Sequence, residues 1–261
     1  MHSATRSPRP RRRTIAALCV AALSGPAAAP ARGDEILVYA AASLTDALEE
    51  IGKAWQAGSG HRVLFNLGAS SDLGRQVCAG APADVFFSAD RERMDLVERA
   101  GMVRATDRVE LLSNSLVVVV PAASSRQVVA PGDLLGVKRL VLADPEAVPA
   151  GVYARRWLQS LGLWDRLRDR VVPALNVRAA LSAVESENAD AAIVYRTDAL
   201  LSRRARIAFE VPRDLAPQIA YVVAALAASN KPAAREFVAY LESPSARAVF
   251  EKYGFVTLRG R

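Results

Sequence analysis

The feature that most constrains this chain is a strand-like apolar run, residues 63–67, that passes through Gly68-Ala69-Ser70-Ser71 into a helical pattern. The first N–H groups of such a helix have no partner within the helix, and the positive end of its dipole points the same way. Together with the two serine hydroxyls, these groups form a seat for an oxyanion. The simpler alternative is that Ser70 or Ser71 only caps the helix, which is the commoner role of serine there.

Residues 1–31 have the pattern of a secretory signal peptide, with arginines, an apolar run at 14–24, and then small residues and prolines up to Ala31. This segment holds five arginines and no acid, so of the 34 basic residues 34 − 5 = 29 remain against 27 acidic ones. The net charge of +7 therefore falls to +2, and we expect no nucleic-acid partner. An export signal with no later apolar run long enough to span a membrane predicts a periplasmic or secreted protein, and we expect the periplasm.

Strand-like runs alternate with helical patterns through the rest of the chain. Three strand–helix pairs between residues 35 and 100 predict a parallel sheet flanked by helices. A second α/β set follows from residue 116 onward. A strand at 221–228 and two helices, 232–241 and 243–253, complete the pattern. The fold class is therefore α/β.

The chain offers little for catalysis or for a resident metal. His61 is the one histidine beyond the leader, and we expect it to be an exposed residue at the start of a strand. The sequence has no Gly-x-Ser-x-Gly elbow and no phosphate-loop motif, and it has too few histidines and cysteines for a zinc cluster. We therefore predict no enzyme, no cofactor and no metal site.

A different pattern recurs: a strand end, then small or hydroxyl residues, then a helix start. It occurs at residues 40–43, 68–71, 149–152 and 176–178. Ligands of open α/β sheets bind at the carboxyl ends of the strands. Four such helix starts predict a site that surrounds a small anion with hydrogen-bond donors only.

Several short motifs follow one another along the chain: Ala40-Ala41-Ala42-Ser43-Leu44, Gly80-Ala81-Pro82-Ala83-Asp84-Val85-Phe86, Ser88-Ala89-Asp90, Asn114-Ser115-Leu116-Val117, Asp144-Pro145-Glu146 with Pro149-Ala150-Gly151, and Ile193-Val194-Tyr195. In order and spacing, between residues 35 and 254, they resemble the periplasmic molybdate-binding proteins of ABC transporters. The resemblance implies a two-lobed class II periplasmic-binding-protein fold, each lobe a mostly parallel sheet flanked by helices, with the ligand in the interlobe cleft. We place residues 34–113 plus 214–261 in lobe 1 and 114–213 in lobe 2.

The resemblance also implies five ligand-binding residues. Ser43 and Ser70 would donate through their hydroxyls, Ala150 and Val177 through their backbone N–H groups, and Tyr195 through its hydroxyl. Each has a simpler reading: the serines as helix caps, Ala150 and Val177 as ordinary loop and helix residues, and Tyr195 as an edge aromatic.

The implied function is capture of molybdate, and of the similar tungstate, by a monomer that delivers the anion to the membrane permease of an ABC transporter. A carrier for another tetrahedral oxyanion, such as sulfate, is the alternative on the same fold. A transcription-factor effector domain and a hydrolase are more distant rivals. Asp72 and Arg196 depart from the family pattern. We expect Asp72 to face away from the anion, because an inward carboxylate would repel it, and Arg196 to lie at the surface rather than at the cleft rim.

Overall fold

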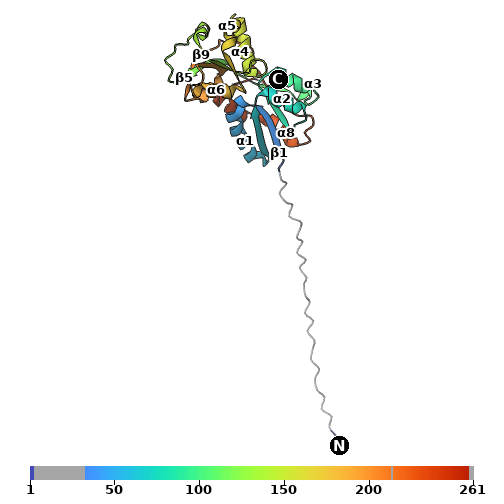
Figure 1. Ribbon diagram of the computed structural model, residues 1–261. Helices are drawn as coiled ribbons and strands as arrows, with labels where there is room; N and C mark the ends of the chain where they lie inside the picture. Colours follow the sequence, from blue (N-terminus) through green and yellow to red (C-terminus); the bar gives the residue numbers. More distant parts are fainter. Residues whose placement is uncertain (3–32, 213, 259–261) are drawn as a thin grey trace. The chain divides into compact units, whose positions relative to one another are not determined.

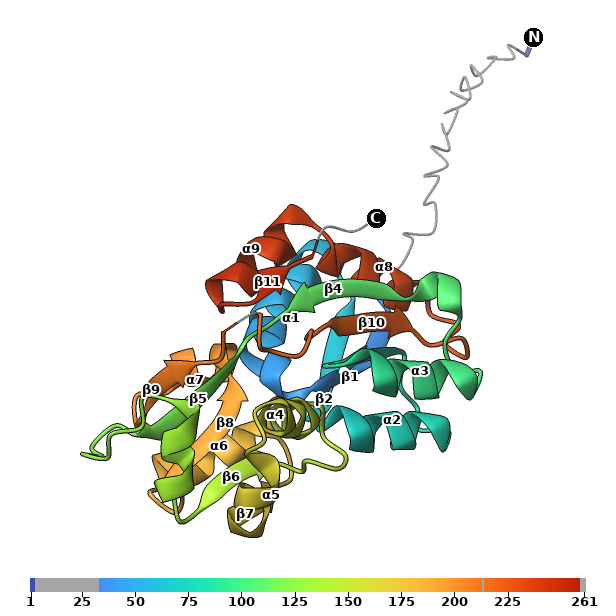
Figure 2. The same ribbon diagram turned by 90° about the horizontal axis from the view of Figure 1, so that it is seen from above.

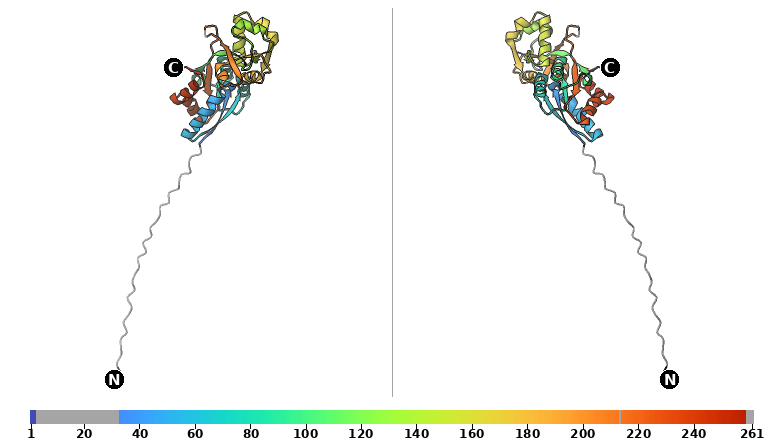
Figure 3. Two further views of the ribbon diagram at one scale, coloured as in Figure 1. Left: turned by 90° about the vertical axis from the view of Figure 1, so that its left-hand side faces the viewer. Right: turned by 90° about the vertical axis from the view of Figure 1, so that its right-hand side faces the viewer.

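The computed structural model describes residues 1–2, 33–212 and 214–258, so the predicted signal peptide lies almost entirely outside the described residues. Two mixed sheets organise residues 33–258. In both views of Figure 3 the second sheet, in green to orange, lies at one end of this folded unit, and the blue and teal strands of the first sheet, within residues 35–88, lie toward the other. None of the described helices is long and apolar enough to cross a membrane.

The first sheet has the strand order β11-β4-β10-β3-β1-β2. Strand β1 pairs in parallel with β2 and β3, as the alternating pattern predicted. Strand β10 is inserted antiparallel between β3 and β4, so β4 again runs in the direction of β1. The strands are β1 (Glu35–Ala41), β2 (Arg62–Gly68), β3 (Val85–Ser88), β4 (Val109–Ser113), β10 (Tyr221–Ala225) and β11 (Val256–Thr257).

The second sheet repeats this plan with the order β7-β6-β8-β5-β9. Strand β6 is parallel to β7 and β8, whereas β5 is antiparallel to both β8 and β9. Each sheet therefore keeps most of its strands in one direction: β10 and β11 are reversed in the first sheet, and β5 in the second. The strands are β5 (Leu116–Pro121), β6 (Leu140–Ala143), β7 (Val171–Ala174), β8 (Ala191–Tyr195) and β9 (Ala205–Glu210).

Helices cover both faces of the first sheet, as Figure 2 shows for α2 and α3 on one side and α1, α8 and α9 on the other. Alternate side chains of one strand enter different cores: Val38 packs in the large core cluster, and Tyr39 in the smaller one with Met94 of α3. The helices are α1 (Thr45–Ser59), α2 (Ser70–Cys78), α3 (Arg91–Arg99), α4 (Pro149–Ser160), α5 (Trp164–Leu167), α6 (Val177–Glu185), α7 (Arg196–Leu201), α8 (Pro232–Leu241) and α9 (Pro244–Lys252).

The chain crosses from the first sheet to the second within two residues, Asn114 and Ser115, between β4 and β5. It returns between β9 and β10, so the first sheet takes strands from both ends of the described chain. The strand-to-helix connections after β1, β2, β6 and β7 bring helix starts to the region between the sheets. These connections position the candidate site.

Candidate functional site

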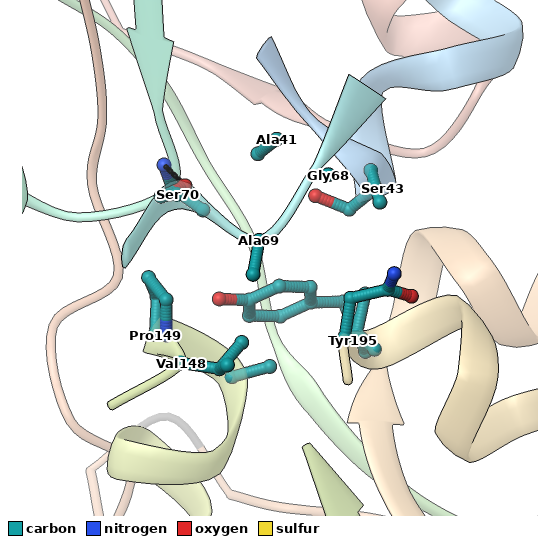
Figure 4. A pocket seen from close by; sticks show the side chains of 13 residues that line it. Ala41, Ser43, Gly68, Ala69, Ser70, Val148, Pro149 and Tyr195 are labelled. Carbon is teal, nitrogen blue, oxygen red and sulfur yellow. Dashed lines mark hydrogen bonds between the residues drawn. The ribbon is translucent and has the colours of Figure 1, made fainter. Parts of the chain in front are cut away.

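A small pocket lies between the two sheets, and all five residues implied by the motifs line it: Ser43, Ser70, Ala150, Val177 and Tyr195. Figure 4 shows the side chains around it. Its volume is about 20 Å³, which exceeds the roughly 10–15 Å³ that one water molecule requires, so it suits a compact ligand. All thirteen lining residues are uncharged.

Ser70 is a pocket residue and is not a helix cap. Helix α2 begins at Ser70 itself, and its N-cap, Ala69, makes no side-chain hydrogen bond. The capping alternative for Ser70 and Ser71 is therefore wrong. The Ala89 backbone N–H donates to Ser70 Oγ over 3.0 Å, and Ser70 is 1% exposed. Because Oγ accepts that bond, the hydroxyl proton of Ser70 is available to another acceptor.

The start of α4 places the N–H of Ala150 at the pocket. Pro149 occupies the first helical position, where the missing N–H costs nothing. Gly151 follows because the helix comes very close to the end of β6: a Cβ at this position would lie 1.9 Å from the carbonyl oxygen of Ala143. The first-turn N–H groups of α4, which include that of Ala150, have no partner within the helix.

Val177 begins α6 in a similar way. The preceding Asn176 caps the helix, and its side-chain oxygen accepts from the N–H of Ala179 over 3.0 Å. The cap satisfies one N–H of the first turn and leaves that of Val177 without an intrahelical partner. The helices α4 and α6, which follow strands of the second sheet, thus point the positive ends of their dipoles at the pocket. Helix α2, which follows a strand of the first sheet, also begins at the pocket.

Tyr195 ends β8 and extends its ring into the pocket, as Figure 4 shows. The side chain is 1% exposed, and its hydroxyl has no hydrogen-bond partner among the described residues. Burial raises the pKa of this hydroxyl well above its usual value of 10.0, so it stays protonated. A buried hydroxyl without a partner is rare in native proteins, and here it is an unused donor aimed at an uncharged pocket.

Ser43 lies in the short 3₁₀ turn Ala42–Leu44 that follows β1, and it is 3% exposed. Its Oγ lies 2.9 Å from the hydroxyl oxygen of Tyr221 on β10. Sequence reasoning did not find Tyr221, which is 178 positions away and reaches Ser43 only because β10 is inserted beside β3.

The charged residues near the motifs stay out of the pocket. Asp72 forms an ion pair with Arg75 over 2.5 Å and does not line the pocket, as we expected of a carboxylate. Arg196 pairs with Glu210 over 3.0 Å at the surface, again as expected. His61 differs from the prediction, because its ring stacks on Trp55 and its Nδ1 accepts from the N–H of Asp34, so it is only partly exposed.

Two ion pairs join the flanks of the pocket across the gap between the sheets. Arg178 of α6 contacts Asp46 of α1 over 2.6 Å, and Arg156 of α4 pairs with Glu92 of α3. Sequence reasoning missed both pairs, although Arg178 directly follows Val177. Within the described residues no cluster of three histidine, cysteine or acidic side chains could hold a metal ion.

A family model described as bacterial extracellular solute-binding protein matches residues 36–256. The chain belongs to this family. The molybdate-binding protein ModA of Escherichia coli (strain K12) is 41% identical to this solute-binding protein over 243 residues, 90% of this chain and 95% of the relative. This relative bears out the resemblance inferred from the motifs.

Solved structures bear out the two-lobed fold. The periplasmic molybdate-binding protein of Azotobacter vinelandii is 24% identical with a TM-score of 0.76, and the match covers 85% of this chain and 98% of that one. The sulfate-binding protein SubI of Mycobacterium tuberculosis H37Rv is 19% identical with a TM-score of 0.75, covering 85% and 86%. At these identities the likeness shows the fold alone, and carriers of two different oxyanions share it.

Proposed function

We propose that this solute-binding protein captures molybdate in the pocket between its sheets and delivers it to the membrane permease of an ABC transporter. The observation that carries the proposal is the unpartnered, buried hydroxyl of Tyr195 in a pocket without a charged side chain. The curated relatives named for molybdate binding support molybdate over other anions.

The chemistry of the pocket matches such an ion. Molybdate is a tetrahedral dianion whose oxygens only accept hydrogen bonds. In the proposal, Ser43, Ser70 and Tyr195 donate through their hydroxyls, and Ala150 and Val177 through backbone N–H groups. Each charge-assisted bond contributes about 1.5–3 kcal/mol. Tungstate is nearly the same size and binds in the same way. Sulfate is smaller, so in a rigid pocket its oxygens lie too far from some of the donors to form hydrogen bonds with all of them.

The proposal assigns residues 34–113 and 214–261 to one lobe and 114–213 to the other. The anion links donors from both lobes and stabilises the closed arrangement. The protein works as a monomer outside the cytoplasm, after removal of residues 1–31, and performs no catalysis. Support for a binding role comes from the relatives that are named for molybdate binding.

A thermal-unfolding scan of residues 32–261 tests the proposal, with molybdate, tungstate, sulfate and phosphate added one at a time. A ligand at a hundredfold excess over its Kd adds about 2.7 kcal/mol, which is about 5–10 °C in Tm for a chain of this size. We expect that rise with molybdate and tungstate. A rise in Tm with sulfate alone would identify sulfate as the ligand in place of molybdate and leave the carrier function intact. No rise in Tm with any of the four anions would refute the proposal.

A further inference from the structure

The direction of one hydrogen bond decides what Ser43 offers to the pocket. Its Oγ and the Tyr221 hydroxyl oxygen are 2.9 Å apart, and the geometry of this pair alone allows either to be the donor. If Ser43 donates, it presents a lone pair to the pocket. If Tyr221 donates, the Ser43 proton turns to the pocket.

Asn114, at the crossover between the sheets, removes this ambiguity. The backbone N–H of Ser115 donates to Asn114 Oδ1 over 2.9 Å, which identifies the oxygen of the side-chain amide. Its Nδ2 therefore faces Thr197 Oγ1 at 2.9 Å and the Tyr221 hydroxyl at 3.3 Å. An amide nitrogen can only donate, so Tyr221 accepts a bond from Asn114.

The Tyr221 proton then needs an acceptor. The residue is 0% exposed, and burial raises the pKa of its hydroxyl far above the usual value of 10.0, so the proton stays on the oxygen. Ser43 Oγ is the other polar atom in contact with this hydroxyl in the described structure. A buried donor without an acceptor is unfavourable, so Tyr221 donates to Ser43.

We propose that Asn114 and Tyr221 are positioning residues that lock Ser43 as a hydrogen-bond donor, and thereby make the pocket select oxyanions that carry no proton. This inference rests on the proposed function and concerns its specificity. Ser70 is locked in the same sense by the Ala89 N–H, which cannot accept. The hydroxyl of an anion such as hydrogen phosphate is itself a donor, so it finds no acceptor at the Ser43 or Ser70 hydroxyl.

Replacing the amide of Asn114 with the isosteric carboxylate reverses the direction of the hydrogen bond between Tyr221 and Ser43. Asn114→Asp keeps an oxygen for the Ser115 N–H but puts an acceptor opposite Tyr221. Tyr221 then donates to that carboxylate, Ser43 donates to Tyr221, and the Ser43 lone pair faces the pocket. We expect molybdate affinity to fall about 10- to 100-fold. The added charge weakens all dianions alike, so the decisive readout is the ratio of hydrogen phosphate affinity to molybdate affinity, which rises at least tenfold.

Two further variants separate positioning from structural damage. Tyr221→Phe frees the Ser43 hydroxyl to rotate, so the same ratio rises while molybdate affinity falls less than in Asn114→Asp. Thr197→Val removes the other acceptor of the Asn114 amide and leaves the Tyr221 bond, so it lowers Tm without changing the ratio. An unchanged ratio in both Asn114→Asp and Tyr221→Phe would overturn the inference.

Neutron diffraction from the deuterium-exchanged wild-type protein tests the lock without any ligand or variant. We expect deuterium on the Tyr221 oxygen directed at Ser43, and the Ser43 deuterium directed into the pocket. A Ser43 deuterium directed at Tyr221 would overturn the inference. If titration shows that the protein binds sulfate and not molybdate, molybdate is refuted as the substrate, and the ratio to measure is hydrogen phosphate affinity to sulfate affinity. If no oxyanion binds, the proposed function fails while the neutron map still decides the direction of the bond.

Discussion

Tyr195→Phe separates binding from stability more cleanly than any other change at the pocket. The substitution removes one oxygen that makes no hydrogen bond to the described protein and leaves the ring in place. The folded protein therefore loses no internal bond, and its Tm without ligand should not fall. The bound anion loses one charge-assisted hydrogen bond, about 1.5–3 kcal/mol. Since 1.4 kcal/mol corresponds to a factor of ten, molybdate affinity should fall about 10- to 150-fold.

Isothermal titration of both proteins with molybdate measures the affinity, and a thermal scan without ligand measures the stability. Tyr240→Phe is the matched control, because Tyr240 lies on α8 and does not line the pocket. It should change neither quantity. The reasoning is refuted if Tyr195→Phe binds molybdate as tightly as the wild type, or if its loss of affinity comes with an equal loss of stability without ligand.

Three further changes test other parts of the pocket. Ser70→Ala should weaken molybdate binding about 10- to 100-fold. It should also lower the free energy of unfolding by about 1–3 kcal/mol, seen as a lower Tm in a thermal scan, because the buried N–H of Ala89 loses its acceptor. Gly151→Ala forces α4 away from β6 and should cost about 1–3 kcal/mol in chemical denaturation, whereas Gly132→Ala, which has open space around it, should cost nothing. Asp46→Asn breaks a partly exposed ion pair across the pocket, so titration should show an affinity loss of at most about fivefold that disappears in high salt.

Local patterns of the sequence were enough to predict the parallel strands β1, β2 and β3 of the first sheet and to single out one pocket residue. Strands β1, β2 and β3 follow from apolar runs, and the glycine and serines after β2 point to an anion seat at Ser70 without any knowledge of the rest of the chain. The sequence did not reveal β4 or β11, because Glu110 interrupts the apolar run of β4 and β11 has only two residues.

For other pocket residues the local pattern marks a helix start but does not identify the residue that binds. Ala150 and Val177 take part through backbone N–H groups, which every residue except proline has, so only the resemblance to a family singles them out. The contacts of Tyr221 and Asn114 behind Ser43 could not be predicted for a different reason, although Asn114 lies in one of the motifs. An apolar run does not tell which strand it pairs with, and the contact of Tyr221 with Ser43 exists because β10 lies between β3 and β4.

The division of the donors between the sheets gives the proposed carrier a way to release its anion without a chemical step. Ser43 and Ser70 follow strands of the first sheet, whereas Ala150, Val177 and Tyr195 belong to the second. In this proposal, separation of the sheets leaves the anion with at most three of the five donors and exposes it to water. A lysine or arginine in the pocket would keep attracting the anion over the widening gap, since a net charge acts at longer range than a hydrogen-bonding dipole. In the proposed mechanism, an uncharged pocket therefore binds the anion tightly when closed and weakly when open, as delivery to a permease requires.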